Sequence, residues 1–337
     1  MLIGAILGFG NIIQANHIKA FLDKRFNDKI TIKAVAEPNA ENRKISEIKF
    51  PQIKFYSSVD DLLNNEKLDF VDIAAPPKFH ATLLQDVIER KFNIICEKPF
   101  TLKLDEAENI KNLLLNSGVK FAPCHQYKYL KIYRAFKSEI EKMDSQDKVM
   151  LRFNVYRTKA DPGLSIFNNS WRTNPAIGGG GILTDTGVHY LYLSNWLLGK
   201  PLSVSTTNLN LSHKEYNVED TSLVTIEFEK GISQIALTWG GNRRFNSSEL
   251  ISKNLSLTYL GGDTFEKFSE DKTETFLVPN PADKSIYTEL YFSLFNDFLN
   301  TCENEVNTHY LVEEAYNSIK LLSSCYLSAS EKRTISL

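Results

Sequence analysis

The feature that most constrains the fold is a regular alternation of short apolar runs with longer helical patterns over residues 1–122. Runs with the length and composition of buried strands occur at 2–7, 31–36, 70–74, 93–96 and 119–123. Between them, apolar residues recur at a spacing of three to four in the segments 12–26, 39–48, 59–64, 79–91 and 104–117. This alternation predicts βαβ units built around a parallel sheet.

The rhythm changes after Pro123. One helix is expected near 128–142, and period-2 patterns predict strands at 147–157, 202–211, 220–229, 231–239 and 254–260. Two closing helices are expected at 283–301 and 309–329. With 337 residues, the chain exceeds the usual size of one core, so we predict two domains, 1–122 and 123–337, the second an α+β domain with a mostly antiparallel sheet.

Charge and composition exclude several classes of partner. The 39 basic and 41 acidic side chains leave a formal net charge of -2, which does not favour nucleic acid. The N-terminus lacks the basic region of a signal peptide, and the most apolar later stretch, 191–198, is far too short to cross a bilayer of roughly 30 Å. The four cysteines show no CxxC pair. We therefore expect a cytoplasmic protein without a membrane partner or disulfides.

The first strand runs into Gly8-Phe9-Gly10. Glycines between a strand and a helix allow a tight turn and close approach of a pyrophosphate, which the free N–H groups of the helix start can bind. Ile13 occupies the position of the third glycine, which predicts looser packing of helix on strand while binding is kept.

Glu37 ends the second predicted strand. A carboxylate there can accept the ribose hydroxyls of NAD and repel a 2′-phosphate, so NAD is favoured over NADP. The residue is also compatible with a solvated acid at a strand end, and Arg43 or Lys44 could restore NADP binding.

Two later strands end in further candidates. Ala75-Pro76-Pro77, with His80, closes the third strand and is equally compatible with a plain βα turn. Glu97-Lys98 follows the fourth strand, where the ammonium could orient or deprotonate a hydroxyl, although most lysines are surface residues.

Asp185 and His189 follow the glycine run 178–181. They are four residues apart in a predicted helix, so both side chains lie on one face. Histidine is the commonest general acid/base, and a carboxylate can hold a hydroxyl or tune the imidazole. A surface pair or half of a metal site are the alternatives.

Further polar residues are candidates for the substrate. Trp171-Arg172 could wall a pocket or anchor a loop, and the polar groups of the segment 125–128 could point into the cofactor crevice. The loops 158–177 and 241–250 are expected to set substrate choice. The remaining histidines have no convergent partners in the sequence and are expected to be ordinary structural or surface residues: His17, His213 and His309.

The ordered set of motifs resembles the glucose-fructose oxidoreductase / inositol dehydrogenase family, Gfo/Idh/MocA. The resemblance runs from Gly8-Phe9-Gly10 through Glu97-Lys98-Pro99 to the stretch 179–189, so it covers essentially the whole chain. It implies an N-terminal Rossmann domain and a C-terminal domain with a large open sheet that commonly mediates dimers or tetramers.

The resemblance also implies residue roles. Lys98 and His189 would flank the reacting carbinol, with His189 as general acid/base, Lys98 orienting the oxygen, and Asp185 binding a neighbouring hydroxyl; Lys98 and His189 could exchange roles. Lys128 would contact substrate, whereas Tyr192 stands where relatives frequently carry an acid, which puts a substrate contact there in doubt.

The expected cofactor contacts are Gly8, Phe9, Gly10, Asn11, Ile12, Glu37, Ala75, Pro76, Pro77, His80, Glu97 and Lys98. The expected substrate contacts are Lys98, Gln126, Lys128, Trp171, Arg172, Asp185 and His189. The prediction is an NAD-dependent oxidoreductase that interconverts a secondary alcohol and a ketone on a sugar, sugar derivative or cyclitol, with no metal. A sugar or dinucleotide sensor on the same fold, and a metal enzyme using Asp185 and His189, are the rivals.

Overall fold

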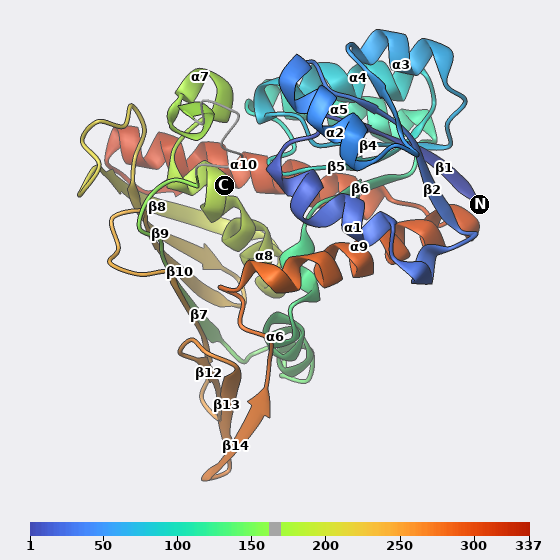
Figure 1. The fold of residues 1–337 in the computed structure, drawn as a ribbon. Coiled ribbons are helices and arrows are strands. Elements are labelled where there is room, and N and C mark those ends of the chain that lie inside the picture. The colour runs from blue at the N-terminus through green and yellow to red at the C-terminus, as the bar shows by residue number, and fades with distance from the viewer. Residues whose placement is uncertain (162–169) are drawn as a thin grey trace. The chain divides into compact units, whose positions relative to one another are not determined.

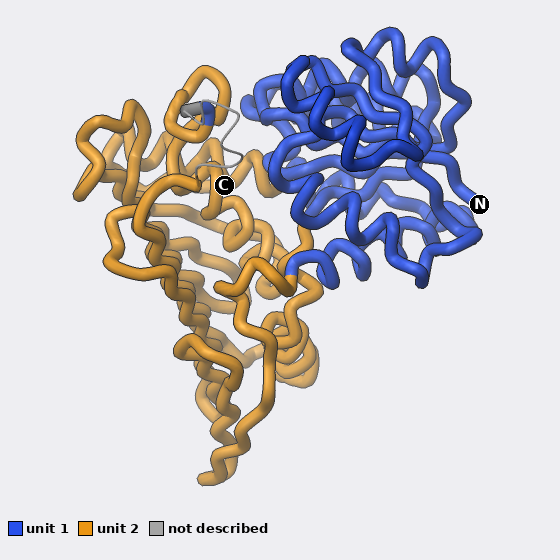
Figure 2. The backbone as a smooth tube through the Cα atoms, viewed as in Figure 1, with its two compact units in different colours: residues 1–124, 162–171, 287–316 blue, residues 125–161, 172–286, 317–337 orange. Residues whose placement is uncertain are grey.

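The computed structural model describes residues 1–161 and 170–337. Part of the segment 158–177, expected to set substrate choice, therefore lies outside the described residues. The chain forms two compact units (Figure 2), and the first consists of Met1–Cys124 and Tyr287–Tyr316, with Trp171. The second consists of His125–Asp161, Arg172–Ile286 and Asn317–Leu337. The sequence pattern, by contrast, predicts a boundary at 122 and assigns all later residues to the second domain.

The first unit contains a six-stranded parallel sheet in the order β3-β2-β1-β4-β5-β6 (Figure 1). Its strands are β1 (Leu2–Leu7), β2 (Ile30–Ala36), β3 (Lys54–Tyr56), β4 (Phe70–Ile73), β5 (Asn93–Cys96) and β6 (Phe121–Pro123). The predicted parallel sheet is confirmed, and the three-residue strand β3 is an addition to the prediction. The order reverses beside β1, so the carboxyl ends of β1 and β4 define the switch point at which such sheets bind ligands.

The connecting helices begin and end where local chemistry favours it. They are α1 (Ile18–Phe21), α2 (Ala40–Lys49), α3 (Val59–Asn65), α4 (His80–Glu89) and α5 (Leu104–Ser117), with shorter turns η1 (Ile13–His17), η2 (Lys24–Phe26) and η3 (Pro77–Phe79). The side chains of Asn39 and Ser58 accept hydrogen bonds at the starts of α2 and α3, and Gly118, with a φ of 75°, ends α5.

The single helix expected at 12–26 is interrupted. Residues Ile13–His17 form a π-helical turn before the short α1. Such turns are rare and are often found at functional sites. The turn contains His17, whose side chain is fully buried.

The helix α9 (Tyr287–Glu303) packs on the first unit, against α1. Phe295 stacks on Phe21 with ring centroids 4.0 Å apart, and Arg25 forms an ion pair with Glu289. These contacts explain why a segment far along the chain belongs to the N-terminal unit. The last helix, α10 (His309–Glu331), has residues in both units.

The second unit contains a nine-stranded sheet in the order β14-β13-β12-β11-β7-β10-β9-β8-β15. Its strands are β7 (Val149–Tyr156), β8 (Pro201–Leu209), β9 (Thr221–Phe228), β10 (Gly231–Thr238), β11 (Phe245–Ile251), β12 (Leu255–Tyr259), β13 (Thr264–Ser269), β14 (Lys272–Leu277) and β15 (Ile335–Ser336). Only the pair β7 and β10 is parallel among the described strand pairs of this sheet, which confirms the mostly antiparallel prediction.

The expectation that 241–250 is a loop is wrong, because β11 begins at Phe245 and pairs with β7 and β12. Several of its buried residues are polar, so a hydrophobic pattern does not reveal the strand. Ser248 hydrogen-bonds the buried hydroxyl of Tyr133, and Ser247 accepts a hydrogen bond from Asn154.

Helices of the second unit carry the candidate site. They are α6 (Lys131–Glu141), α7 (Pro175–Gly178) and α8 (Val188–Leu198), with turns η4 (Gln126–Tyr129), η5 (Ser170–Thr173) and η6 (Leu183–Gly187); η7 (Lys284–Ile286) lies just before α9. The helix α8 packs against α6 and β10, which explains its almost complete burial.

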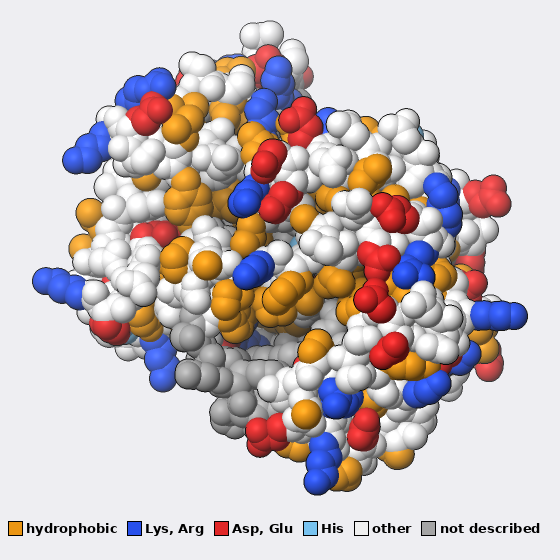
Figure 3. Space-filling view, turned by 90° about the horizontal axis from the view of Figure 1, so that it is seen from above, with side chains coloured by type: hydrophobic (Ala, Val, Ile, Leu, Met, Phe, Trp, Pro, Cys, Tyr) orange, Lys and Arg blue, Asp and Glu red, His pale blue; other side chains and the backbone are white. Residues whose placement is uncertain are grey.

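The surface matches the balanced charge of the sequence. On the face shown in Figure 3, basic and acidic side chains are interspersed. Across the part of the chain that the structure describes, no helix is both long and apolar enough to span a membrane.

Candidate functional site

In the first unit, the glycine turn is fitted to the end of β4. Gly8 has a φ of +93°, and a Cβ there would lie 3.0 Å from the Cα and N of Ala75. A side chain at this position would therefore be strained and would collide with backbone. Gly10 has open space where its Cβ would point, so the outer side of the turn is accessible to a ligand.

The carboxylate of Glu37 is bonded back to this turn. Its Oε2 accepts the amide of Phe9 at 3.0 Å and the side-chain amide of Asn42 at 2.8 Å, while Oε1 accepts the amide of Asn39. A carboxylate has about four lone-pair sites, so these three bonds leave about one for a ribose hydroxyl. Arg43 donates to the carbonyl of Glu37 at 2.7 Å, so a guanidinium also stands at this strand end.

His80 braces two of the predicted segments. Its Nε2 lies 2.8 Å from the carbonyl oxygen of Ala75 and its Nδ1 lies 2.8 Å from that of Pro99. Burial lowers the pKa of this histidine. Because His80 is fully buried, it has no exposed surface for a cofactor and instead holds the two segments together. Phe9 and Pro77 are also buried, whereas Ala75 and Pro76 are partly exposed.

The turn after β5 is fixed by the side chain of Glu97. Its Oε2 accepts the backbone amide of Lys98 at 3.0 Å, and its Oε1 accepts from Tyr291 at 2.6 Å and lies 3.1 Å from Nε2 of His17. Burial raises the pKa of Glu97, but His17, Lys98 and Tyr291 together lower it to about 2. Glu97 is therefore a buried anion that orders the backbone of Lys98.

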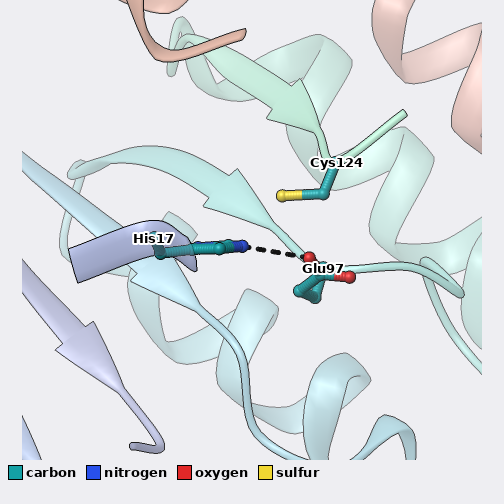
Figure 4. A group of neighbouring side chains, drawn as sticks. All are labelled: His17, Glu97 and Cys124. Atoms are coloured by element: carbon teal, nitrogen blue, oxygen red, sulfur yellow. Dashed lines mark hydrogen bonds and ion pairs between the residues drawn. The ribbon is translucent and has the colours of Figure 1, made fainter. Parts of the chain in front are cut away.

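His17, expected to be an ordinary structural or surface residue, is fully buried and has two acidic partners in the fold. Its imidazole contacts Glu97, as Figure 4 shows, and also Asp72, and the two acids come from different strand segments. Neither acid is adjacent to His17 in sequence, so only the fold brings them together. The available signal was the presence of a polar Asp72 inside the apolar strand β4, where a buried carboxylate needs a partner.

In the second unit, the glycine run permits contact with Glu219. A Cβ on Gly181 would lie 1.9 Å from the carbonyl oxygen of Glu219. The Glu219 carboxylate accepts the amides of Gly181 and Leu183 at 3.0 and 3.1 Å, and the hydroxyl of Tyr326 at 2.8 Å. An acid at a helix start satisfies amides that have no intrahelical acceptor. Glu219, which the sequence prediction missed, thus anchors the start of the turn that carries Asp185.

Asp185 is paired with a residue predicted for the substrate. Its Oδ1 accepts from Nε of Arg172 at 3.1 Å, and Nη1 of Arg172 also donates to the carbonyl of Asp161. The guanidinium therefore fixes the position of the Asp185 carboxylate. Trp171, next to Arg172, is half-buried.

His189 is held by two aromatic residues. The ring of Tyr127 stacks on the imidazole, with centroids 4.1 Å apart and an interplanar angle of 13°. The hydroxyl of Tyr192 lies 3.1 Å from Nδ1 and accepts the backbone amide of Tyr127 at 3.0 Å. His125 stacks in turn on Tyr192. These contacts fix the orientation of the candidate acid/base, and the sequence pattern marks Tyr192 only as a departure from the family.

Two further substrate candidates, Gln126 and Lys128, lie in the turn η4 beside Tyr127. Gln126 is buried, and Nζ of Lys128 lies 5.8 Å from the ring centroid of Trp196. Lys98 belongs to the first unit, whereas Lys128, Arg172, Asp185 and His189 belong to the second.

Among residues 1–161 and 170–337, one group has three potential metal donors within 4.8 Å of one another: His17, Glu97 and Cys124 (Figure 4). Both nitrogens of His17 already face carboxylates, and burial raises the pKa of the Cys124 thiol well above its usual value. A metal needs a neutral imidazole and a thiolate, so this group fits a hydrogen-bonded cluster better than a metal centre.

Comparison with known proteins agrees with the two-unit architecture. Residues 4–125 match the Gfo/Idh/MocA oxidoreductase family with an NAD-binding Rossmann fold, and residues 147–251 match the C-terminal domain of that family. An uncharacterized protein of Saccharomyces cerevisiae is 26% identical over 66% of this chain and 63% of its own length. Inositol 2-dehydrogenase of Leifsonia xyli is 26% identical over 67% of this chain and also 63% of its own length.

A solved structure extends the agreement to the whole fold. Levoglucosan dehydrogenase, in a complex with NADH and levoglucosan, covers 99% of each chain with a TM-score of 0.86 at 18% identity. The family matches and this shared fold lead to one conclusion: the chain belongs to the Gfo/Idh/MocA family of oxidoreductases, and its N-terminal unit is an NAD-binding Rossmann domain.

Proposed function

We propose that this protein is an NAD-dependent dehydrogenase that interconverts a secondary alcohol and a ketone on a sugar, a sugar derivative or a cyclitol. The observation that carries the proposal is the restraint of His189, whose ring is stacked on Tyr127 and held at Nδ1 by Tyr192. A general acid/base needs a fixed orientation towards the proton that it transfers. The sugar-type substrate is supported by the relatives named inositol 2-dehydrogenase and levoglucosan dehydrogenase.

The proposed roles divide between the units. Bound NAD supplies the acceptor for the hydride that leaves the carbinol carbon. The glycine turn at Gly8 and Gly10 would receive the pyrophosphate, with Ala75 and Pro76 lining the same edge of the sheet. The accessible side of Gly10 supports this assignment. Glu37 would accept one ribose hydroxyl through its remaining lone pair.

The proton would be handled by the second unit. His189 would take the hydroxyl proton through Nε2, in the tautomer whose Nδ1–H donates to the hydroxyl oxygen of Tyr192. The Asp185 carboxylate, fixed by Arg172, would accept a hydrogen bond from a neighbouring hydroxyl. Lys98, a residue of the first unit, is proposed to orient the substrate oxygen. Oxidation of the alcohol would then give a ketone, with the hydroxyl proton on His189.

The ion pair between Asp185 and Arg172 also bears on the metal alternative. A divalent cation at Asp185 and His189 would have to displace or tolerate a guanidinium already bound to the carboxylate. We therefore propose a reaction that needs no metal.

The protein would work as a homodimer or homotetramer in the cytoplasm.

The test is a screen of sugars, inositols and their keto forms with NAD and NADP, following the absorbance of the reduced nicotinamide. We expect turnover with NAD, and a loss of roughly 10²- to 10⁴-fold in kcat for His189→Ala. The matched control is His309→Ala, because His309 is exposed and has no part in the site. Tight NADH binding with no turnover on any substrate, and no effect of His189→Ala, would instead identify a sensor.

A further inference from the structure

A buried chain of ionisable groups lies beneath the turn that contains Lys98. His17 is fully buried in the π-helical turn before α1, with Nδ1 2.8 Å from Oδ2 of Asp72 and Nε2 3.1 Å from Oε1 of Glu97. Asp72 is fully buried within β4, and Glu97 follows β5. The imidazole therefore connects the ends of two neighbouring strands at the carboxyl edge of the sheet.

The partners of Glu97 decide which groups are charged. Its Oε1 accepts the hydroxyl of Tyr291 and its Oε2 accepts the backbone amide of Lys98, and the pKa of Glu97 is lowered to about 2. An ionised carboxylate accepts and does not donate, so Nε2 of His17 must carry a proton. Nδ1 of His17 lies 2.8 Å from Oδ2 of Asp72, so an imidazolium that donates to both acids is the protonation state that matches both contacts.

Burial raises the pKa of the Asp72 carboxyl, and the contact with His17 only partly offsets this. Burial lowers the pKa of His17, but Asp72 and Glu97 outweigh burial and raise it to about 9. The other groups that face the imidazole are the rings of Tyr291 and Phe295 from α9, at centroid distances of 4.0 and 5.2 Å. The Cys124 thiol also lies close, and burial keeps it protonated.

Glu97 transmits this restraint to the candidate catalytic lysine. One oxygen faces His17 and the other accepts the amide of Lys98. The next residue, Pro99, is held from the far side by His80. A carboxylate with one oxygen fixed by a buried cation cannot rotate freely, so the position of the Lys98 backbone depends on His17.

We propose that His17 is a positioning residue for Lys98, acting through the carboxylate of Glu97. This proposal rests on the proposed function for the part that concerns catalysis. Its structural part, the hold of His17 on the Lys98 turn, is independent of the reaction.

The test uses the full-length protein and the variants His17→Gln and Asp72→Asn. Asp72→Asn is the smaller perturbation, because it removes one charge and keeps the size of the side chain. It leaves residues Glu97 and Lys98 unsubstituted. Imidazole ¹⁵N resonances followed against pH report the protonation of His17, and backbone ¹⁵N spectra with amide exchange report the order of the Lys98 turn. Steady-state kinetics give kcat and KM across pH, and His309→Ala is the control.

We expect the wild-type His17 ring to carry two protons at neutral pH and to lose one near pH 9. In the wild type, kcat should fall as His17 loses this proton. In Asp72→Asn both the titration and the fall in kcat should move towards neutral pH. In His17→Gln the Lys98 amide should exchange faster, and kcat should fall by roughly 10- to 100-fold with little change in the KM for NAD.

A neutral His17 ring at pH 7 overturns the proposal, whatever the activity. An unchanged Lys98 amide and an unchanged kcat profile in both variants, with only a lower resistance to urea, would show a purely stabilising ion pair and would also overturn it. If the wild type turns nothing over, the proposed function fails, while the exchange of the Lys98 amide still decides whether His17 holds this turn. If His17→Gln does not fold, the titration of His17 and the exchange of the Lys98 amide in Asp72→Asn decide the same question.

Discussion

Replacing Gly8 with alanine tests whether the glycine turn is required by the fold itself. The backbone at Gly8 has a φ of +93°, and the new Cβ would lie 3.0 Å from the Cα and N of Ala75 and 3.1 Å from the carbonyl carbon of Ala74. The left-handed conformation costs a residue with a Cβ about 1–2 kcal/mol, and overpacking adds about 1–3 kcal/mol. The neighbours are backbone atoms and cannot rotate away. We therefore expect Gly8→Ala to lower the free energy of unfolding by about 2–5 kcal/mol.

Two other glycines separate the cost of the left-handed backbone conformation from the cost of the steric clash. Gly118 has a φ of +75° with nothing within 4 Å of an added Cβ, so Gly118→Ala should show the conformational cost alone, about 1–2 kcal/mol. Gly10 also has nothing within 4 Å, so Gly10→Ala should change stability by less than about 1 kcal/mol. It places a methyl group where the pyrophosphate would lie, so the affinity for NADH should fall by about 10-fold or more, since about 1.4 kcal/mol is tenfold.

The assay combines urea unfolding, followed by circular dichroism, with titration of NADH fluorescence for all three variants. Gly8→Ala should unfold at lower urea, whereas Gly10→Ala should unfold like the wild type and bind NADH weakly. A Gly8→Ala protein as stable as the wild type would refute the steric argument. Wild-type affinity in Gly10→Ala would refute the assignment of this turn to the cofactor.

Three further predictions concern the restraint of His189, pH and metal. Tyr192→Phe removes the hydroxyl at Nδ1 of His189, so kcat should fall roughly 10- to 100-fold; steady-state kinetics showing a rise in KM alone would contradict the role of Tyr192. The pKa of Glu97 is lowered to about 2, so the urea midpoint should fall as pH drops below about 4.5 and Glu97 becomes protonated. The pKa of His17 is raised to about 9, so the urea midpoint should also fall as pH rises from about 6.5 through 9 and His17 loses its proton. This alkaline loss in the free energy of unfolding should amount to about 3 kcal/mol. The alkaline loss should be absent in His17→Gln, and a parallel decline in that variant would be evidence against His17 as its cause. Treatment with a chelator should leave turnover unchanged, and a loss that added metal restores would favour the metal-dependent alternative.

The short motifs could be predicted from the sequence because each consists of residues that are close together in the chain. Gly8-Phe9-Gly10 and Asp185 with His189 each depend on a few consecutive residues and on a strand or helix whose periodicity is visible. The parallel sheet was predictable for the same reason, because its strands other than β3 are short, mostly apolar runs. The strand β11 was not, because its buried positions include Asn246, Ser247 and Ser248.

The residues that restrain these motifs come from distant parts of the chain. Glu219 anchors Gly181 from 38 residues away, and Asp72 and Glu97 reach His17 across 55 and 80 residues. A polar residue in a sequence shows that a partner is needed when it is buried, but not which residue supplies it. Glu37 illustrates the same limit: its identity suggested a ribose contact, whereas its bonds to the Phe9 and Asn39 amides depend on the fold.

The sequence by itself determined the alternation of strands and helices in most of the first unit and the family, because both are encoded in local periodicity or short motifs, and it supplied the candidate reactive side chains. Only the tertiary structure decided how those side chains are held. The stacking of Tyr127 on His189 and the burial of His17 between two acids arise from packing between segments that are far apart in the chain, and the pairing of Arg172 with Asp185 depends on the turns that lie between them. Their protonation and orientation follow from that packing, since burial removes the solvent that would otherwise set both.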